Sequence, residues 1–119
     1  DREAIRTASK KLLEGWAIGI FVDGTRQRDG KVNSPLSGAA LISARTGAYI
    51  LPVAIVNSHK ALGSGSLLPR LIPIHIRIGN PIPPPINRKK DDLKLVTNQI
   101  QVTINRMLDQ GLCKLKDKN

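Results

Sequence analysis

Residues 21–30 bring together side chains that can bind an anion, in the order Phe-Val-Asp-Gly-Thr-Arg-Gln-Arg-Asp-Gly. Gly24 allows the backbone to approach a ligand closely, because it carries no Cβ. Thr25 offers a hydroxyl, and the Arg26 guanidinium is a planar fork that matches phosphate oxygens. A polar turn of this kind after an apolar run is typical of anion sites at the edge of an α/β sheet. The alternative is an ordinary turn whose charges are only solvated, and the spacing by itself leaves both interpretations open.

The elements before and after this stretch are predicted to hold it at a sheet edge. Residues 2–14 have apolar positions at helical spacing and predict a helix. Residues 16–22 are rich in Ile, Phe and Val and predict a buried strand, which Trp16 would anchor in the core. Residues 37–45 predict a second helix that Gly47 would end in the left-handed conformation.

The middle of the chain predicts two more strands. Residues 49–56 form an apolar run in which Pro52 marks a bulge, an edge or the start of the strand. Residues 57–68 are a Gly/Ser-rich loop, whose His59 and Lys60 either touch a ligand phosphate or simply lie on the surface. Residues 73–79 alternate isoleucines with polar side chains, which predicts a half-exposed strand.

The C-terminal part predicts a connector and a long helix. Residues 81–90 are proline-rich, and residues 91–111 form an amphipathic helix that Gly111 would end. Its predicted buried stripe consists of Leu93, Val96, Ile100, Ile104, Met107 and Leu108. The elements together predict a single partial domain, residues 1–119, of class α/β, with a mixed sheet covered by helices.

The charge of the chain indicates the class of partner. The net charge is +10, and residues 24–90 carry ten basic groups against one acidic group. Such a field attracts phosphates from an anionic lipid surface, a phosphorylated metabolite, an acidic carrier or nucleic acid. The single cysteine, Cys113, excludes an internal disulfide and lies too far from the two histidines to suggest a metal site. A first residue of Asp1 rather than methionine suggests a piece of a longer protein.

The motif and its surroundings resemble the glycerolipid acyltransferases, with a bacterial character. Residues 21–26 are similar to the family's Phe-Pro-Glu-Gly-Thr-Arg block, with Asp23 in place of the glutamate and Val22 in place of the proline. The family's Val-Pro-Val-Ala-Ile block and its closing strand resemble residues 50–55 and 76–82. The resemblance implies an incomplete α/β acyltransferase domain that lacks N-terminal strands, which would leave apolar surface bare.

The resemblance also implies roles for individual residues. Arg26 would hold the phosphate of lysophosphatidic acid, the Gly24 and Thr25 backbone would line the loop, and Asp23 would brace it. Arg2 either is an arginine of an earlier family block that contacts the phosphate or lies a few residues after it. Further candidates near the site are Arg28, Lys31 and Pro52. Leu36 departs from the family pattern, because relatives carry a lysine there.

The reaction that the resemblance implies passes an acyl group from acyl-CoA or acyl carrier protein to 1-acylglycerol 3-phosphate, giving phosphatidic acid. The family's general base is a histidine followed five positions later by an aspartate. Neither His59 nor His75 is followed by an aspartate at that spacing, so we expect no catalytic residue in this chain and no turnover by it. We expect no cofactor and no metal. The expected location is the cytoplasmic face of the cell membrane, against an anionic surface.

Two other functions fit part of the pattern. A small basic nucleic-acid-binding protein would explain the sequence pI of about 10.4. However, aromatic residues make up only 3% of the chain, so no base-stacking platform is present and nucleic acid is not the expected partner. A non-catalytic acyltransferase-like scaffold would differ from an enzyme only in whether its parent chain carries the histidine.

Overall fold

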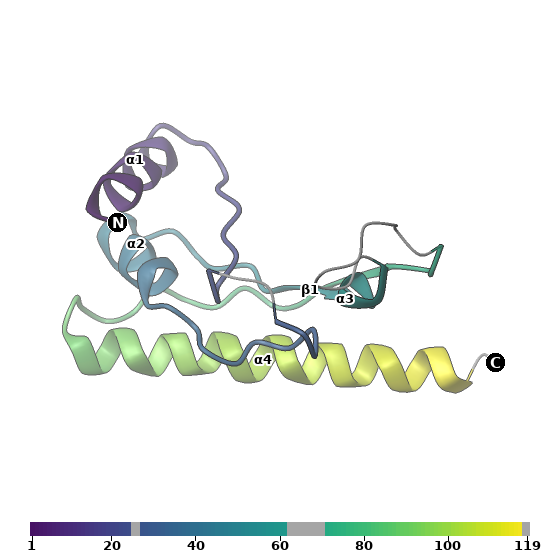
Figure 1. The fold of residues 1–119 in the computed structure, drawn as a ribbon. Coiled ribbons are helices and arrows are strands. Elements are labelled where there is room, and N and C mark those ends of the chain that lie inside the picture. The colour runs from purple at the N-terminus through teal and green to yellow at the C-terminus, as the bar shows by residue number, and fades with distance from the viewer. Residues whose placement is uncertain (25–26, 62–70, 118–119) are drawn as a thin grey trace.

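The computed structural model describes residues 1–24, 27–61 and 71–117, without the side chains of residues 113 and 115–117. Figure 1 shows a long helix, α4, lying beneath the other elements, with α1 and α2 stacked above its N-terminal half. The longest dimension of the molecule, 45 Å, is that of α4 (Lys90–Asp117). A helix of this length spans about 42 Å at a rise of ~1.5 Å per residue. The element order is α1, α2, β1, α3, β2, α4.

The first two helices form where the sequence predicts them. The Asp1 carboxylate caps α1 (Arg2–Leu13) by accepting a hydrogen bond from the Glu3 N–H at 3.0 Å. The second helix, α2 (Gly38–Thr46), packs against both α1 and α4. Gly47 ends it with φ of +74°, the left-handed conformation that the sequence indicates.

A two-stranded antiparallel sheet lies over α4. Strand β1 (Val53–Val56) pairs with β2 (His75–Ile78) in a register that places Val53 opposite Ile78 and Ile55 opposite Ile76. An isolated bridge between Ile50 and Ile82 extends the pairing. The short helix α3 (Ser58–Ala61) follows β1 and occupies the start of the predicted loop 57–68, whose last residues lie outside the described part. The fold class is α/β, as predicted, and the described sheet contains this one antiparallel pair.

The core lies between α4 and the elements above it. The predicted stripe is confirmed, since Val96, Ile100, Met107 and Leu108 are buried, while Leu93 and Ile104 pack against them. The partners of this stripe are Ala39 and Ala40 of α2, Ile82 of the bridge, and Ala54 and Val56 of β1.

The prediction that Gly111 ends the last helix is wrong, because α4 continues to Asp117. Gly111 is buried, and a Cβ built on it would lie 2.7 Å from Val56 Cγ2. The glycine therefore allows the helix to pass close to β1 rather than marking its end.

The predicted buried strand at residues 16–22 is also wrong. The segment has no strand pairing with the described residues, and Trp16 and Phe21 are 63% and 87% exposed. A strand needs a neighbour for its hydrogen bonds, and β1 pairs with β2 instead. Val22 at the end of the segment is half-buried and packs against the core.

The outer face of the sheet is apolar and uncovered by described residues. Ile76 and Ile78 are each 67% exposed, and Val53 and Ile55 lie opposite them on β1. The prediction of a half-exposed strand is wrong for β2, because none of its residues is buried. Its isoleucines form an exposed face, while the half-buried Arg77 faces α4 and donates to the Met107 carbonyl oxygen at 3.4 Å. Bare apolar surface was expected for an incomplete domain, and this face and residues 16–22 display it.

None of the described helices combines the length and the apolarity that crossing a bilayer requires.

Candidate functional site

The motif loop, which we define as residues 23–34, is closed by the Asp23 carboxylate. Asp23 Oδ2 accepts a hydrogen bond from the Asn33 N–H at 3.1 Å, and Oδ1 accepts one from the Ser34 N–H at 3.1 Å. One side chain therefore joins the beginning of the loop to its end. Gly24, directly after Asp23, has φ of +67°, a conformation that favours glycine. The next two predicted site residues, Thr25 and Arg26, lie outside the described residues.

The second turn of the loop is organised by another carboxylate. Asp29 Oδ1 accepts hydrogen bonds from the Lys31 N–H and from the Asn33 side-chain amide, both at 3.0 Å. The backbone hydrogen bond from Lys31 and the side-chain hydrogen bond from Asn33 lower the pKa of Asp29 below its ordinary 3.8. Asn33 thus contacts both carboxylates, with its backbone at Asp23 and its side chain at Asp29.

Helix α4 holds the far end of the loop. Asn105 Oδ1 accepts from the Val32 N–H at 2.8 Å, and Asn105 Nδ2 donates to the Val32 carbonyl oxygen at 2.9 Å. Gln101 Nε2 donates to the same carbonyl oxygen at 2.9 Å. Lys31 Nζ lies 3.1 Å from Asp109 Oδ1. Because Gln101, Asn105 and Asp109 are spaced four residues apart, they lie along one side of the helix.

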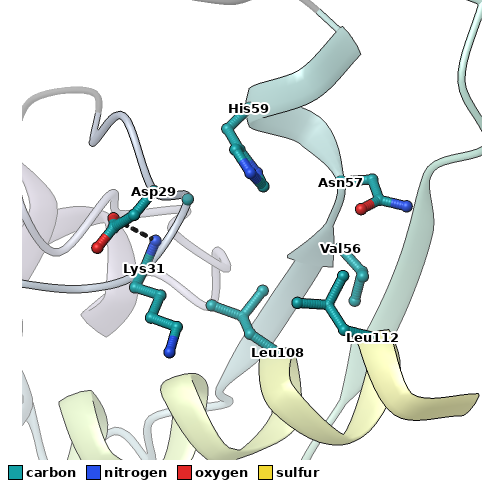
Figure 2. A pocket seen from close by; sticks show the side chains of 8 residues that line it. Asp29, Lys31, Val56, Asn57, His59, Leu108 and Leu112 are labelled. Atoms are coloured by element: carbon teal, nitrogen blue, oxygen red, sulfur yellow. Dashed lines mark hydrogen bonds between the residues drawn. The ribbon is translucent and has the colours of Figure 1, made fainter. Parts of the chain in front are cut away.

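Helix α3 contacts the loop from the opposite side, as Figure 2 shows for His59 above Asp29 and Lys31. A Cβ built on Gly30 would overlap the His59 imidazole, so the imidazole packs directly against the Gly30 backbone. The recess beside this contact has a volume of about 20 Å³ and is floored by Leu108 and Leu112 of α4. That volume suits one water molecule rather than a phosphate group. His59 therefore acts in this structure as a packing partner of the loop.

The other candidates from the sequence lie at several places. Arg2 is exposed in the first turn of α1, which packs on α2, and Arg28 is exposed within the loop. Lys31 pairs with Asp109. Pro52 is buried just before β1, where its carbonyl oxygen accepts from the Gly79 N–H at 2.9 Å. It stands at the start of the strand, one of the three placements that the sequence allowed.

Leu36, which stands where relatives carry a lysine, lies beside the motif loop. Leu36 is exposed, and its N–H donates to the Val22 carbonyl oxygen at 2.8 Å. Its Cδ1 would lie 3.0 Å from a Cβ on Gly24, so this side chain covers the loop backbone beside the predicted anion site. A lysine here would place a cation next to Gly24.

Among the described residues, no group of three His, Cys, Asp or Glu side chains lies close enough to hold a metal ion.

Three residues that contact the loop, Gln101, Asn105 and Asp109, were not identified from the sequence. Their polar side chains recur every four residues within an otherwise amphipathic helix. That spacing predicts a polar side of the helix, but the contact with Val32 joins residues 73 positions apart and has no local signal.

Comparison with known proteins agrees with the motif. Residues 1–56 match the family model described as Acyltransferase. A stretch of 66 residues is 36% identical to the 1-acyl-sn-glycerol-3-phosphate acyltransferase of Borreliella burgdorferi, covering 50% of this chain and 26% of that protein. Stretches of 64 residues are 28% and 27% identical to chloroplastic enzymes of the same name from Arabidopsis thaliana and Brassica napus.

These two matches cover 54% of this chain and 18% and 19% of the plant proteins. The aligned stretch thus spans about a fifth to a quarter of the length of these relatives. No solved structure matches the chain. The family model and the three relatives confirm the resemblance predicted from the motif.

Proposed function

We propose that the chain is the acceptor-binding part of a 1-acyl-sn-glycerol-3-phosphate acyltransferase and that the motif loop binds the phosphate of the acceptor. The observation that carries this proposal is the closure of the loop by Asp23. Its carboxylate is occupied by two backbone N–H groups at the opposite end of the loop. It therefore serves as a brace and is not aimed at a ligand. The residues between these ends include Gly24, Thr25 and Arg26, which supply backbone, hydroxyl and guanidinium donors for an anion.

The surrounding charges support an anionic ligand. Asp29 is the only acidic residue among residues 24–90, and its carboxylate accepts hydrogen bonds from Lys31 and Asn33. Ten basic residues in the same range leave a positive field around the loop. A phosphate would enter this field with electrostatic attraction, and a neutral acylglycerol would not.

The proposed reaction moves an acyl group from the thioester of acyl-CoA or acyl carrier protein to the free hydroxyl of the acceptor. The new ester bond forms as the thioester bond breaks, the hydroxyl proton goes to a general base, and the thiol leaves. We assign no base to this chain, so the isolated chain binds acceptor without turnover. The proposed place of the whole enzyme is the cytoplasmic face of a membrane, where its anionic substrate resides.

The test is a titration of the 119-residue chain with a short-chain 1-acylglycerol 3-phosphate, compared with the matching 1-acylglycerol that lacks the phosphate. Arg26→Ala should weaken binding of the phosphorylated ligand by roughly 10- to 100-fold, because a charge-assisted hydrogen bond contributes about 1.5–3 kcal/mol. Binding of the neutral ligand should not change.

Arg45→Ala is the matched control, because Arg45 is an exposed arginine in the last turn of α2. It removes the same charge from the chain, so a purely long-range field effect would weaken binding equally in both variants. Equal losses in the two variants, or no preference for the phosphorylated ligand, would refute the role of Arg26. Binding of duplex DNA with a steep salt dependence and no binding of the lipid would favour the nucleic-acid alternative.

A further inference from the structure

We propose that Asn105 is a positioning residue for the anion-binding part of the motif loop, acting through Val32; the substrate side of this proposal rests on the proposed function. Asn105 lies outside residues 1–56, the segment that matches the family model. Its carboxamide pairs with both the N–H and the carbonyl oxygen of Val32, at 2.8 and 2.9 Å. A side chain of α4 thus makes the two hydrogen bonds that a neighbouring strand would make.

The contact is partly shielded from solvent. Val32 is 8% exposed, and its carbonyl oxygen also accepts from Gln101 at 2.9 Å. Hydrogen bonds shielded from water are costly to leave unmade, because the polar groups lose solvation without recovering a partner. Val32 therefore has a strongly preferred place on α4.

The backbone connects Val32 directly to the residues that bind the Asp23 carboxylate. The next two residues, Asn33 and Ser34, provide the N–H groups that the Asp23 carboxylate accepts. A displacement of Val32 would carry both donors away from Asp23. Asp23 is adjacent to Gly24, the first of the proposed anion-binding residues, so the brace fixes the backbone at the start of that segment.

The residue type fits this task. A primary amide offers a donor and an acceptor side by side at neutral pH, which matches the N–H and carbonyl groups of one backbone residue. An ionised aspartate would accept from the N–H and repel the carbonyl oxygen. The helix that carries Asn105 is fixed to the core by Ile100, Met107 and Leu108.

The test compares three variants of the 119-residue chain, with Asn98→Ala as the matched control. Asn98 is exposed on the same helix, so Asn98→Ala makes the same change in helix propensity without touching the loop. Asn105→Ala removes both hydrogen bonds to Val32. Asn105→Asp keeps the acceptor and removes the donor at neutral pH.

Two measurements are made on each variant. Amide hydrogen exchange by NMR reports Val32, Asn33 and Ser34 in the loop, with Ala54 of β1 as the readout of global folding. Titration with short-chain 1-acylglycerol 3-phosphate reports binding. Asn105→Ala should lower exchange protection in the loop by about tenfold or more, since two hydrogen bonds are lost, and leave Ala54 unchanged. It should raise the Kd for the phosphorylated ligand at least about fivefold, with Asn105→Asp in between and Asn98→Ala like the wild type.

The outcomes separate the two proposals. A Kd in Asn105→Ala equal to that of the wild type would overturn the positioning role, as would a uniform loss of protection that includes Ala54. If Asn105→Ala does not fold, Gln101→Ala removes one donor to Val32 and should show the same effects at smaller size; no change in the Kd would again overturn the role. A wild-type chain that does not bind the ligand, while Asn105→Ala still loosens Val32, would refute the proposed function and leave the structural contact intact.

Discussion

Replacing Gly111 with alanine tests how closely α4 approaches the sheet. A Cβ at this position would lie 2.7 Å from Val56 Cγ2, and Val56 is fully buried in β1. A contact this short forces one of the two elements to move. Arg77 Cδ, at 3.4 Å, is the next nearest atom and can shift more readily, because it belongs to a flexible side chain.

Two opposing effects determine the result. Alanine is preferred over glycine in a helix interior by about 1 kcal/mol. Inserting a methyl group into a packed core costs about 1–3 kcal/mol. The clash should exceed the gain in helix propensity, so we expect Gly111→Ala to lower the free energy of unfolding by roughly 0.5–2 kcal/mol.

The partner substitution Val56→Ala removes the methyl groups that cause the clash. It should itself cost about 1–3 kcal/mol through lost burial. In that background Gly111→Ala should become stabilising by about 1 kcal/mol, because only the propensity effect remains. The expected signature is therefore a change of sign between the two backgrounds, which is a coupling energy of roughly 1–3 kcal/mol.

The assay is urea unfolding followed by circular dichroism at 222 nm, since Trp16 is too exposed to report on the core. Gly38→Ala is the matched control, because Gly38 opens α2 and its Cβ would meet no atom within 4 Å. It should be neutral or stabilising. Equal effects of Gly111→Ala in the wild-type and Val56→Ala backgrounds would show that α4 does not approach β1 as described, and would refute the reasoning.

Three further predictions concern charge and exposed surface. Because the pKa of Asp29 is lowered in the folded protein, its carboxylate stabilises the fold fully above its ordinary pKa of 3.8 and loses this contribution as the pH falls through the folded-state pKa. Asp29→Asn should therefore reduce the pH dependence of the free energy of unfolding, measured between pH 2 and 6. Lys31→Ala should lower the free energy of unfolding by less than about 1 kcal/mol in the same assay, because its ion pair with Asp109 is exposed. The chain should self-associate through the outer face of the sheet; Ile55→Lys with Ile76→Glu places opposite charges across the strands and should shift sedimentation toward the monomer, whereas an unchanged profile would show that another surface associates.

The helices could be predicted because their signals are local. The apolar spacing of α4 identifies Val96, Ile100 and Met107 as its buried side, and the structure buries them against α2 and β1. The end of α2 at Gly47 likewise depends on one residue and its backbone conformation. Neither feature needs information from a distant part of the chain.

The errors all involve contacts between distant residues. Residues 16–22 have the composition of a strand, but pairing depends on a neighbour that composition does not supply. Alternation in β2 separates Ile76 from Arg77 correctly, yet which face is buried depends on where α4 lies. Gly111 has the local signal of a helix end, but in the structure it allows α4 to pass close to Val56 of β1.

In the candidate site, too, local features could be predicted from the sequence and contacts between distant residues could not. The sequence of residues 23–26 was enough to suggest anion chemistry, because the donors are adjacent in the chain. The contacts that hold the described part of the loop are spread over the molecule, from Asp23 through Val32 to α4. The segment that matches the family model, residues 1–56, does not contain Asn105, the residue that we propose to position the loop, since Asn105 lies on α4. It follows that grafting residues 21–34 onto another α/β scaffold would carry the donors but lose the Val32 anchor, and that any anion affinity of such a graft should depend on restoring an amide at the place of Asn105.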